Sequence, residues 1–131
     1  MKNLLLALIT FISVLSLSSC KEVGKARDVA NRFYELRQNQ QNDKAASLCS
    51  EEFYSVTTKD YFVDVLEQID NNFGKLQSFE SSNFNIETKN GKTTTSFRYT
   101  VNYENGISND SIVLIKKGNN YKILYYSYNF E

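Results

Sequence analysis

The hydrophobic pattern of this chain changes its period at Gly74. Before this glycine, apolar residues recur every three or four positions, which is the spacing of amphipathic helices. After it, apolar and polar residues alternate, which is the spacing of half-buried strands. Because the helical and strand patterns are segregated along the chain, we expect an α+β fold with helices on one face of an antiparallel sheet.

Two Asn-Gly pairs divide the strand-forming part into hairpins. Asn90-Gly91 and Asn105-Gly106 each predict a two-residue turn, since asparagine and glycine accept the positive φ that such turns require. A loop at 117–120 then completes a meander of four strands. These turns predict that Phe84 pairs with Phe97, Ile86 with Thr95, Tyr99 with Ile112, Phe97 with Leu114, Leu114 with Ile123 and Ile112 with Tyr125.

The second strand indicates which face of the sheet is buried. Its odd positions from 97 to 103 are apolar or aromatic, whereas its even positions from 96 to 102 are polar. We therefore expect the helices to cover the odd face. A polar break at 81–83 predicts that the first strand bends or bulges there.

Three helices are predicted before the change of period. The first spans about 25–38, and Arg37 lies at the edge of its apolar stripe. A short second helix over 45–49 follows Asp43, whose carboxylate is a suitable N-cap. Thr57 begins a sequence that resembles a capping box at the start of the third helix, and the glycine at the change of period ends it.

The N-terminal segment follows neither pattern. Lys2 precedes an uncharged apolar run at 4–15, and small polar residues follow that run. The run is shorter than the roughly 18 apolar residues that a membrane-spanning helix needs. A positive start, a short apolar run and small residues are typical of a cleaved export signal. An uncleaved N-terminal anchor is the alternative.

The residues Leu17-Ser18-Ser19-Cys20 resemble the lipobox of bacterial lipoproteins. The resemblance implies that the Cys20 thiol receives a diacylglycerol, that the peptide is cut before it, and that the mature N-terminus carries fatty acyl chains such as palmitate. Two or more acyl chains anchor a protein stably, whereas one gives only marginal binding. Lys21 is not the aspartate that favours inner-membrane retention in enteric-type bacteria, so we expect the periplasmic side of the outer membrane.

The lipobox divides the chain into a signal peptide at 1–19, a lipidated tether at 20–24 and a single domain at 25–131. Lipidation of Cys20 would leave Cys49 without an intramolecular partner, so no disulfide is expected. We interpret Cys49 as a small buried residue of the second helix and not as a reactive thiol.

The composition excludes several classes of function. The chain has 15 basic and 15 acidic residues, and the basic ones are scattered among carboxylates, so we expect no nucleic-acid partner. It contains no histidine, which is the commonest general base and metal ligand. Asp60, Asp64 and Glu67 share one predicted helix face, but we interpret them as a solvated face and expect no metal ion and no cofactor.

The final third of the chain is similar to the strand-turn-strand-turn-strand ending of the nuclear-transport-factor-2-like superfamily, at 99–106, 112–116 and 118–123. The segments 30–34 and 45–48 also match the opening helices of that superfamily. The resemblance implies a cone in which three N-terminal helices cover the concave face of a curled, four-stranded antiparallel sheet. As a whole, the chain resembles small bacterial lipoproteins that contain such a domain.

The enzymes of this superfamily have residues that this chain does not match. Ketosteroid isomerases combine an aspartate base with a tyrosine and a protonated aspartate in an apolar cone. Here Glu87, Glu104 and Asp110 lie in or near predicted turns, so no buried carboxylate pair is evident. Dehydratase relatives use a histidine and an aspartate, and the chain has no histidine. We expect a noncatalytic protein, with isomerase- or dehydratase-like chemistry as the less favoured interpretation.

Two regions are candidate binding sites. The cone pocket is either filled core or binds a small apolar ligand. Its predicted lining is Phe33, Tyr34, Phe62, Leu66, Phe97, Tyr99 and Tyr125. The outward face of the last two strands is either covered by the tether or contacts a partner, in a homodimer or in an envelope assembly. Its predicted residues are Val113, Ile115, Leu124, Tyr126 and Tyr128.

Overall fold

The computed structural model describes the backbone of residues 2–131 and the side chains of residues 20–131. The predicted signal peptide at 1–19 therefore lies outside the residues whose side chains are described. Within the described part of the chain, no helix is both long enough and apolar enough to cross a membrane.

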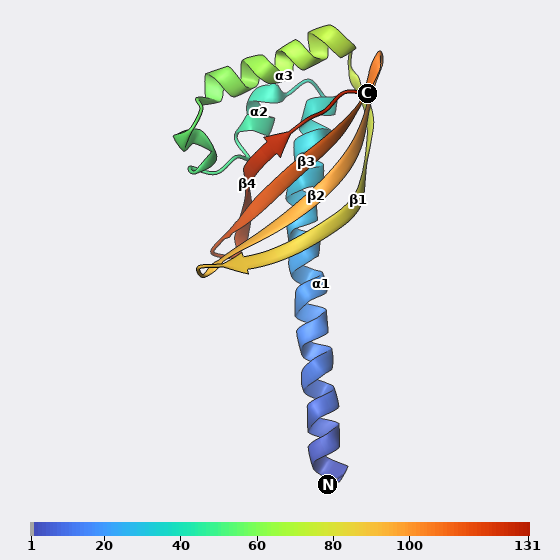
Figure 1. The fold of residues 1–131 in the computed structure, drawn as a ribbon, viewed down its shortest axis with the longest axis vertical. Coiled ribbons are helices and arrows are strands. Elements are labelled where there is room, and N and C mark those ends of the chain that lie inside the picture. Colours follow the sequence, from blue (N-terminus) through green and yellow to red (C-terminus); the bar gives the residue numbers. More distant parts are fainter. Residues whose placement is uncertain (1) are drawn as a thin grey trace.

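Three α-helices and a short 3-10 helix precede the sheet. They are α1 (Lys2–Gln38), α2 (Asn42–Ala46), η1 (Phe53–Ser55) and α3 (Lys59–Phe73). Figure 1 shows α1 running along one face of the curved sheet, with α2 and α3 grouped toward the end of the molecule where the C-terminus lies. The three predicted helices are present, although α1 starts well before residue 25.

The ends of α3 explain why this segment folds as a separate helix. Thr58, one residue after the predicted Thr57, is the N-cap, and its Oγ1 accepts a 3.1 Å hydrogen bond from the backbone N–H of Tyr61. Gly74 ends the helix with a φ of 83°. A Cβ at Gly74 would lie 2.7 Å from the Cβ of Glu104, so glycine is required by both conformation and space.

Two local predictions about the helices are wrong. Asp43 lies in the first turn of α2 and not at its N-cap, which is Gln41, and its Oδ1 is 3.5 Å from Nζ of Lys59. Residues 20–24, predicted as a tether, are part of α1, and Val23 is 7% exposed. The packed domain therefore begins before residue 25, since the apolar side chain of Val23 joins the core.

The sheet consists of β1 (Leu76–Lys89), β2 (Lys92–Tyr103), β3 (Gly106–Lys117) and β4 (Asn120–Ser127). All neighbours are antiparallel and the spatial order is β1-β2-β3-β4. The predicted α+β class, with helices packed on a four-stranded antiparallel sheet, is confirmed. A register shift between Ser81 and Phe84 confirms the predicted irregularity in the first strand.

The two Asn-Gly pairs differ in how well they predict the hairpins. Around the first pair, Phe84 lies opposite Phe97, as predicted. At the second pair, Tyr103 pairs directly with Gly106, so the turn lies one residue earlier than predicted. Phe97 consequently lies opposite Ile112. Every side chain of β2 and β3 keeps its predicted face, because the register moves by an even number of residues.

A β-bulge in β4 reverses the predicted faces of the last residues. The pairing of Ile123 with Leu114 follows the prediction, but the register then shifts and Leu124 is the extra residue. As a result Ile112 lies opposite Tyr126 and not opposite Tyr125. From the bulge onward, the side chains of β4 exchange faces relative to a regular alternation.

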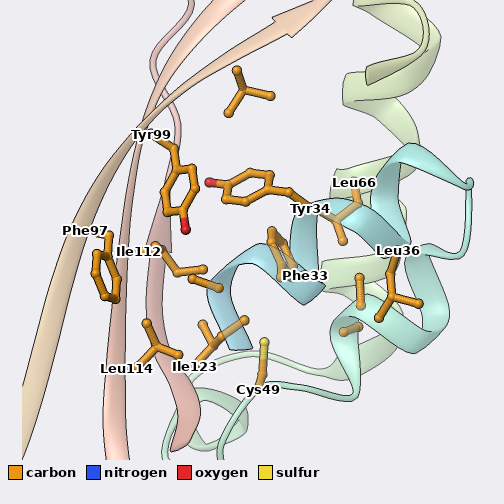
Figure 2. Packing of buried hydrophobic residues seen from close by; sticks show 14 of the residues in the cluster. Phe33, Tyr34, Leu36, Cys49, Leu66, Phe97, Tyr99, Ile112, Leu114 and Ile123 are labelled. Carbon is orange, nitrogen blue, oxygen red and sulfur yellow. The ribbon is translucent and has the colours of Figure 1, made fainter. Parts of the chain in front are cut away.

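The core lies between α1 and the face of the sheet that carries the odd-numbered residues of β2 (Figure 2). The rings of Tyr34 and Tyr99 pack with centroids 4.6 Å apart, and Phe33 meets Tyr34 edge-on at 5.2 Å. Phe97 and Ile123 are 1% and 0% exposed, on the face that the alternation assigns to the core. Full burial of an apolar side chain of this size contributes about 2 kcal/mol to stability, so this layer holds the helices on the sheet.

Candidate functional site

Cys20 is an exposed residue of α1. It lies three positions before Val23, the first buried residue among those whose side chains are described. Together with Phe84 and Ile86 of β1, Cys20 lines a groove of about 280 Å³. Because its thiol is not packed in the core, a group attached to this sulfur would not disturb the fold.

The residues predicted to line the cone come together, with one exception. Six of them form part of the buried cluster and are between 0% and 6% exposed: Phe33, Tyr34, Phe62, Leu66, Phe97 and Tyr99. Figure 2 shows the rings of Tyr34 and Tyr99 facing each other across the space between α1 and the sheet. The exception is Tyr125, which the bulge turns to the opposite face and which is 54% exposed. The described side chains therefore fill the cone as core.

A buried carboxylate lies beside this aromatic cluster. Asp110 of β3 is 2% exposed, and its Oδ2 accepts hydrogen bonds from the hydroxyls of Tyr34 at 2.9 Å and Tyr126 at 3.2 Å. Ser108 donates to Oδ1 at 2.5 Å. Burial raises the pKa of Asp110, and the three donated hydrogen bonds oppose this rise because they favour the charged form.

The two tyrosines are well suited to act as permanent donors to this carboxylate. Burial is the main cause that raises the pKa of Tyr34 and of Tyr126 well above the ordinary tyrosine value. Both hydroxyls therefore keep their protons across the physiological range. Asp110 is thus a fully hydrogen-bonded group in a closed environment.

The sequence contains a signal for this cluster. Asp110 is predicted to lie in or near a turn, but this residue lies inside β3 and its side chain is buried, so that prediction is wrong. Asp110 shares its even position with Ile112 and Leu114, and both are fully buried. Strand alternation alone therefore assigns the carboxylate to the core face.

A second polar cluster joins α1, α2 and α3. The side chain of Arg37 is wholly buried, and its Nη2 lies 2.7 Å from Oδ1 of Asp70. Arg37 also donates through Nη1 to the hydroxyl of Tyr103 at 2.9 Å and through Nε to Oδ1 of Asn42 at 3.2 Å. Asn42 in turn donates to Oδ2 of Asp70 at 2.8 Å. The apolar stripe places Arg37 at a helix edge, whereas it lies at the centre of this junction.

Other reactive groups do not gather into a site in the part of the chain that the structure describes. Burial raises the pKa of Cys49 to about 12, so its thiolate is disfavoured at neutral pH. Cys49 is buried, as predicted, but it lies beyond the end of α2 at Ala46 and forms a β-bridge with Ile123, so its predicted place in the second helix is wrong. Among residues 20–131, no three His, Cys, Asp or Glu side chains are grouped so that they could hold a metal ion.

The predicted interface residues do not form one surface. Tyr126 lies on the core side, where its ring is 5.3 Å from that of Phe33. Tyr128 follows it on the same side, 45% exposed and with its ring 6.0 Å from that of Tyr126. Ile115 is on the outward face but only 3% exposed. The bulge is the physical reason that Tyr126 and Tyr128 are wrongly placed by a strict alternation.

A smaller apolar surface remains on the outward face of β3 and β4. Val113 and Leu124 are partly exposed there, next to Tyr125. Val113 and Tyr125 line a groove of about 330 Å³, whose polar contributions include Ser96, Arg98 and Ser111. Tyr125 thus replaces Tyr126 and Tyr128 in the outward surface.

Comparisons with known proteins identify the fold. No protein-family model and no curated protein sequence matches the chain. The structure of Bd1075 from Bdellovibrio bacteriovorus is similar, with a TM-score of 0.54 and 14% identity, over 80% of this chain and 40% of that one. A protein named "Putative Scytalone Dehydratase" from Novosphingobium aromaticivorans has a TM-score of 0.61 and 14% identity, over 88% of each chain. The fold is nuclear-transport-factor-2-like.

This fold agrees with the architecture that the sequence resemblance implies. This chain spans 40% of the length of Bd1075, and its helices and curled sheet match nearly the whole of the second protein. At 14% identity, the likeness establishes the nuclear-transport-factor-2-like fold and not an activity.

Proposed function

We propose that the chain matures at Cys20 into a lipid-anchored, noncatalytic lipoprotein of the cell envelope, on the periplasmic side of the outer membrane. The observation that supports this most directly is the position of Cys20, which is exposed and immediately precedes the packed domain. Acyl chains on this residue would enter a bilayer without removing any side chain from the core. Lys21, directly after it, supports the outer-membrane assignment.

The noncatalytic part of the proposal is supported by the closure of the polar clusters. A general acid or base must come within hydrogen-bonding distance of its substrate. Tyr34 and Asp110 are 0% and 2% exposed, and the side chain of Arg37 is wholly buried. Their polar atoms are also bonded to one another and to neighbouring groups. We infer that both clusters order the core and do not turn over a substrate.

Metabolic labelling tests the anchor, because the two cysteines of the chain provide a matched pair. Cells fed an alkyne analogue of palmitate should label the wild-type protein and Cys49→Ala, but not Cys20→Ala. The intact mass of the purified protein should match a chain that starts at residue 20 and carries acyl groups. Label that persists in Cys20→Ala would contradict the proposal, as would a wild-type mass that includes residues 1–19.

A second candidate function is supported by the groove that Val113 and Tyr125 line together with residues of β1 and β2. The groove has a volume of about 330 Å³, and the 54% exposed Tyr125 forms part of its apolar wall. Exposed apolar surface rimmed by polar groups is typical of protein contact sites. We propose that this groove binds another protein of the envelope or a second copy of this chain.

Photo-crosslinking in intact cells distinguishes the partners of that groove. A benzoylphenylalanine in place of Tyr125 should give a discrete crosslinked species, because this position lies in the groove. The same residue in place of Tyr61, which is 64% exposed on α3, serves as the control. Twice the mass of the chain would identify a homodimer, and another discrete mass an envelope partner. Equal crosslinking at both positions would contradict a specific site.

A further inference from the structure

The turns of the β1–β2 hairpin and of the β3–β4 hairpin lie at the end of the domain from which α1 extends toward its N-terminus (Figure 1). Glu22 of α1 connects to the second of these hairpins. Its Oε2 lies 3.0 Å from Nζ of Lys116 and accepts a 2.5 Å hydrogen bond from the hydroxyl of Tyr121. Cys20 therefore belongs to the same end of the molecule as the hairpin tips, which we call the anchor end.

The anchor end exposes apolar side chains beside Cys20. Phe84 and Ile86 are 54% and 41% exposed on β1, an edge strand of the sheet. They line the groove of about 280 Å³ with Cys20 and with Gly24, where an added Cβ would meet no atom within 4 Å. Large exposed apolar residues on an edge strand promote unwanted pairing unless something covers them.

A cation also borders this groove. The guanidinium carbon of Arg27 lies 5.8 Å from the ring centroid of Phe84 and 5.3 Å from that of Phe97. The Nε of Arg27 is buried and has no hydrogen-bond partner among the described residues. The groove therefore combines apolar walls with a bordering guanidinium cation.

Exposed lysines lie on the elements that form the groove, next to Cys20 on α1 and at the turn between β1 and β2. Lys21 on α1 and Lys89 and Lys92 at the tip of the first hairpin are exposed, and none forms a salt bridge with another described residue. Glu87 is the single carboxylate in the hairpin segment 84–95. At the other end of the molecule, α3 carries exposed carboxylates at Asp60, Asp64 and Glu67. The anchor end thus carries three exposed lysines without a salt-bridge partner among the described residues, whereas α3 presents a row of carboxylates at the other end.

We infer that the anchor end docks noncovalently on the surface of an anionic lipid bilayer, through Phe84 and Ile86 together with Lys21 on α1 and with Lys89 and Lys92 at the hairpin tip. Apolar side chains enter the headgroup boundary, while lysine ammonium groups stay at the level of the lipid phosphates. Each lysine near an anionic surface strengthens binding about fivefold. The inference rests on the proposed lipidation of Cys20, which delivers this end, and not another, to the bilayer.

Hydrogen–deuterium exchange of the lipidated protein in vesicles tests the docking. The processed protein is purified in detergent and reconstituted into phosphatidylethanolamine vesicles with phosphatidylglycerol or, separately, into phosphatidylcholine vesicles. Exchange in the segment 84–92 should slow on the anionic vesicles relative to the neutral ones, while exchange in α3 stays the same. The double variant Lys89→Glu, Lys92→Glu should abolish this protection. Loss of the two lysines weakens binding to the anionic surface about 25-fold, and the new glutamates are repelled by it.

The controls separate the docking from the anchor and from net charge. Lys44→Glu with Lys75→Glu makes the same charge change at exposed positions away from the anchor end and should keep the protection. Phe84→Ser with Ile86→Ser should reduce it even though both lysines remain. Protein that floats with the vesicles but shows no protection at 84–92 would overturn the docking alone. Protein that carries no acyl group and does not float would contradict the proposed anchoring instead.

Discussion

The guanidinium of Arg37 lies 2.7 Å from the carboxylate of Asp70, in a junction where the arginine side chain is wholly buried and the aspartate side chain is 16% exposed. This ion pair connects the last turn of α1 to α3, two helices that are separated by a long stretch of chain. Arg37 also donates to the backbone carbonyl of Leu66 at 3.4 Å. The junction therefore fixes α3 relative to the cone.

Removal of the counter-charge at this junction should be costly. Asp70→Asn keeps the shape of the side chain but leaves the buried guanidinium without a neutralising charge, and we expect a loss of about 3 kcal/mol in the free energy of unfolding. Glu35→Gln breaks the exposed pair of Arg32 and Glu35 and should cost less than about 1 kcal/mol. Denaturant unfolding measures both. Similar losses in the two variants would contradict a buried charge at Arg37.

The stability of the protein should depend on pH through Asp110. Burial raises its folded-state pKa above the ordinary value of 3.8, so from that value upward to the raised pKa the folded state binds more protons than the unfolded chain. The free energy of unfolding contributed by this group therefore falls as pH rises through that window. In Asp110→Asn, which does not titrate, this decrease should be absent.

Denaturant unfolding of both proteins at a series of pH values from 4 upward measures this effect. The stability of Asp110→Asn relative to the wild type should increase with pH. Loss of hydrogen bonds from Tyr34, Tyr126 and Ser108 adds an offset that does not change with pH in this range. A difference that stays constant with pH would show that Asp110 is not perturbed by burial.

The β-bulge predicts opposite effects for two adjacent tyrosines. Tyr126→Ala removes a ring that packs against Phe33 and Phe62 and donates to Asp110, so we expect a loss of about 3 to 5 kcal/mol. Tyr125→Ala removes a ring that is 54% exposed and should change stability by less than about 0.5 kcal/mol. Thermal or denaturant unfolding checks the pair. A larger loss for Tyr125→Ala would mean that β4 has no bulge.

Two glycines should respond in opposite directions to alanine. Gly74→Ala introduces a Cβ at a φ of 83°, 2.7 Å from the Cβ of Glu104, so we expect a loss of more than about 1 kcal/mol. Gly24→Ala adds a methyl group in open space within α1 and should increase stability by about 0.5 to 1 kcal/mol. Midpoints of denaturant unfolding measure both shifts. Destabilisation by Gly24→Ala would show that this part of α1 is not helical in solution.

Local signals predict most of the architecture because they follow from the backbone itself. Gly74 separates the two hydrophobic periods and ends α3 with a positive φ. The pair at 90–91 forms the turn that it predicts, with positive φ at both residues. The pair at 105–106 does not, because Gly106 meets a different need. A Cβ there would lie 2.8 Å from the ring of Phe73, so this glycine serves close packing and not a turn.

The sequence predicts the candidate site less well than the fold, for three physical reasons. In β4, Ile123, Leu124, Tyr125 and Tyr126 are all apolar or aromatic, so an inserted residue leaves no break in the pattern. The polar neighbours of Asp110 suggest an exposed segment, and only its alternation with the apolar Ile112 and Leu114 indicates that it is buried. An aromatic stripe also has the same sequence whether its rings meet or leave space between them, and only their packing distances show that they fill the cone.

If the protein is anchored through Cys20 as proposed, the continuity of α1 through this residue limits how far the domain can extend from the membrane. In the proposed mature form, the three positions from Cys20 to Val23 rise by only about 4.5 Å along the helix, and Val23 is already fixed in the core. A rigid spacer of this length gives the domain almost no radius of diffusion around its lipid. Whatever the domain binds would have to be present at the membrane surface, because the domain cannot travel to it.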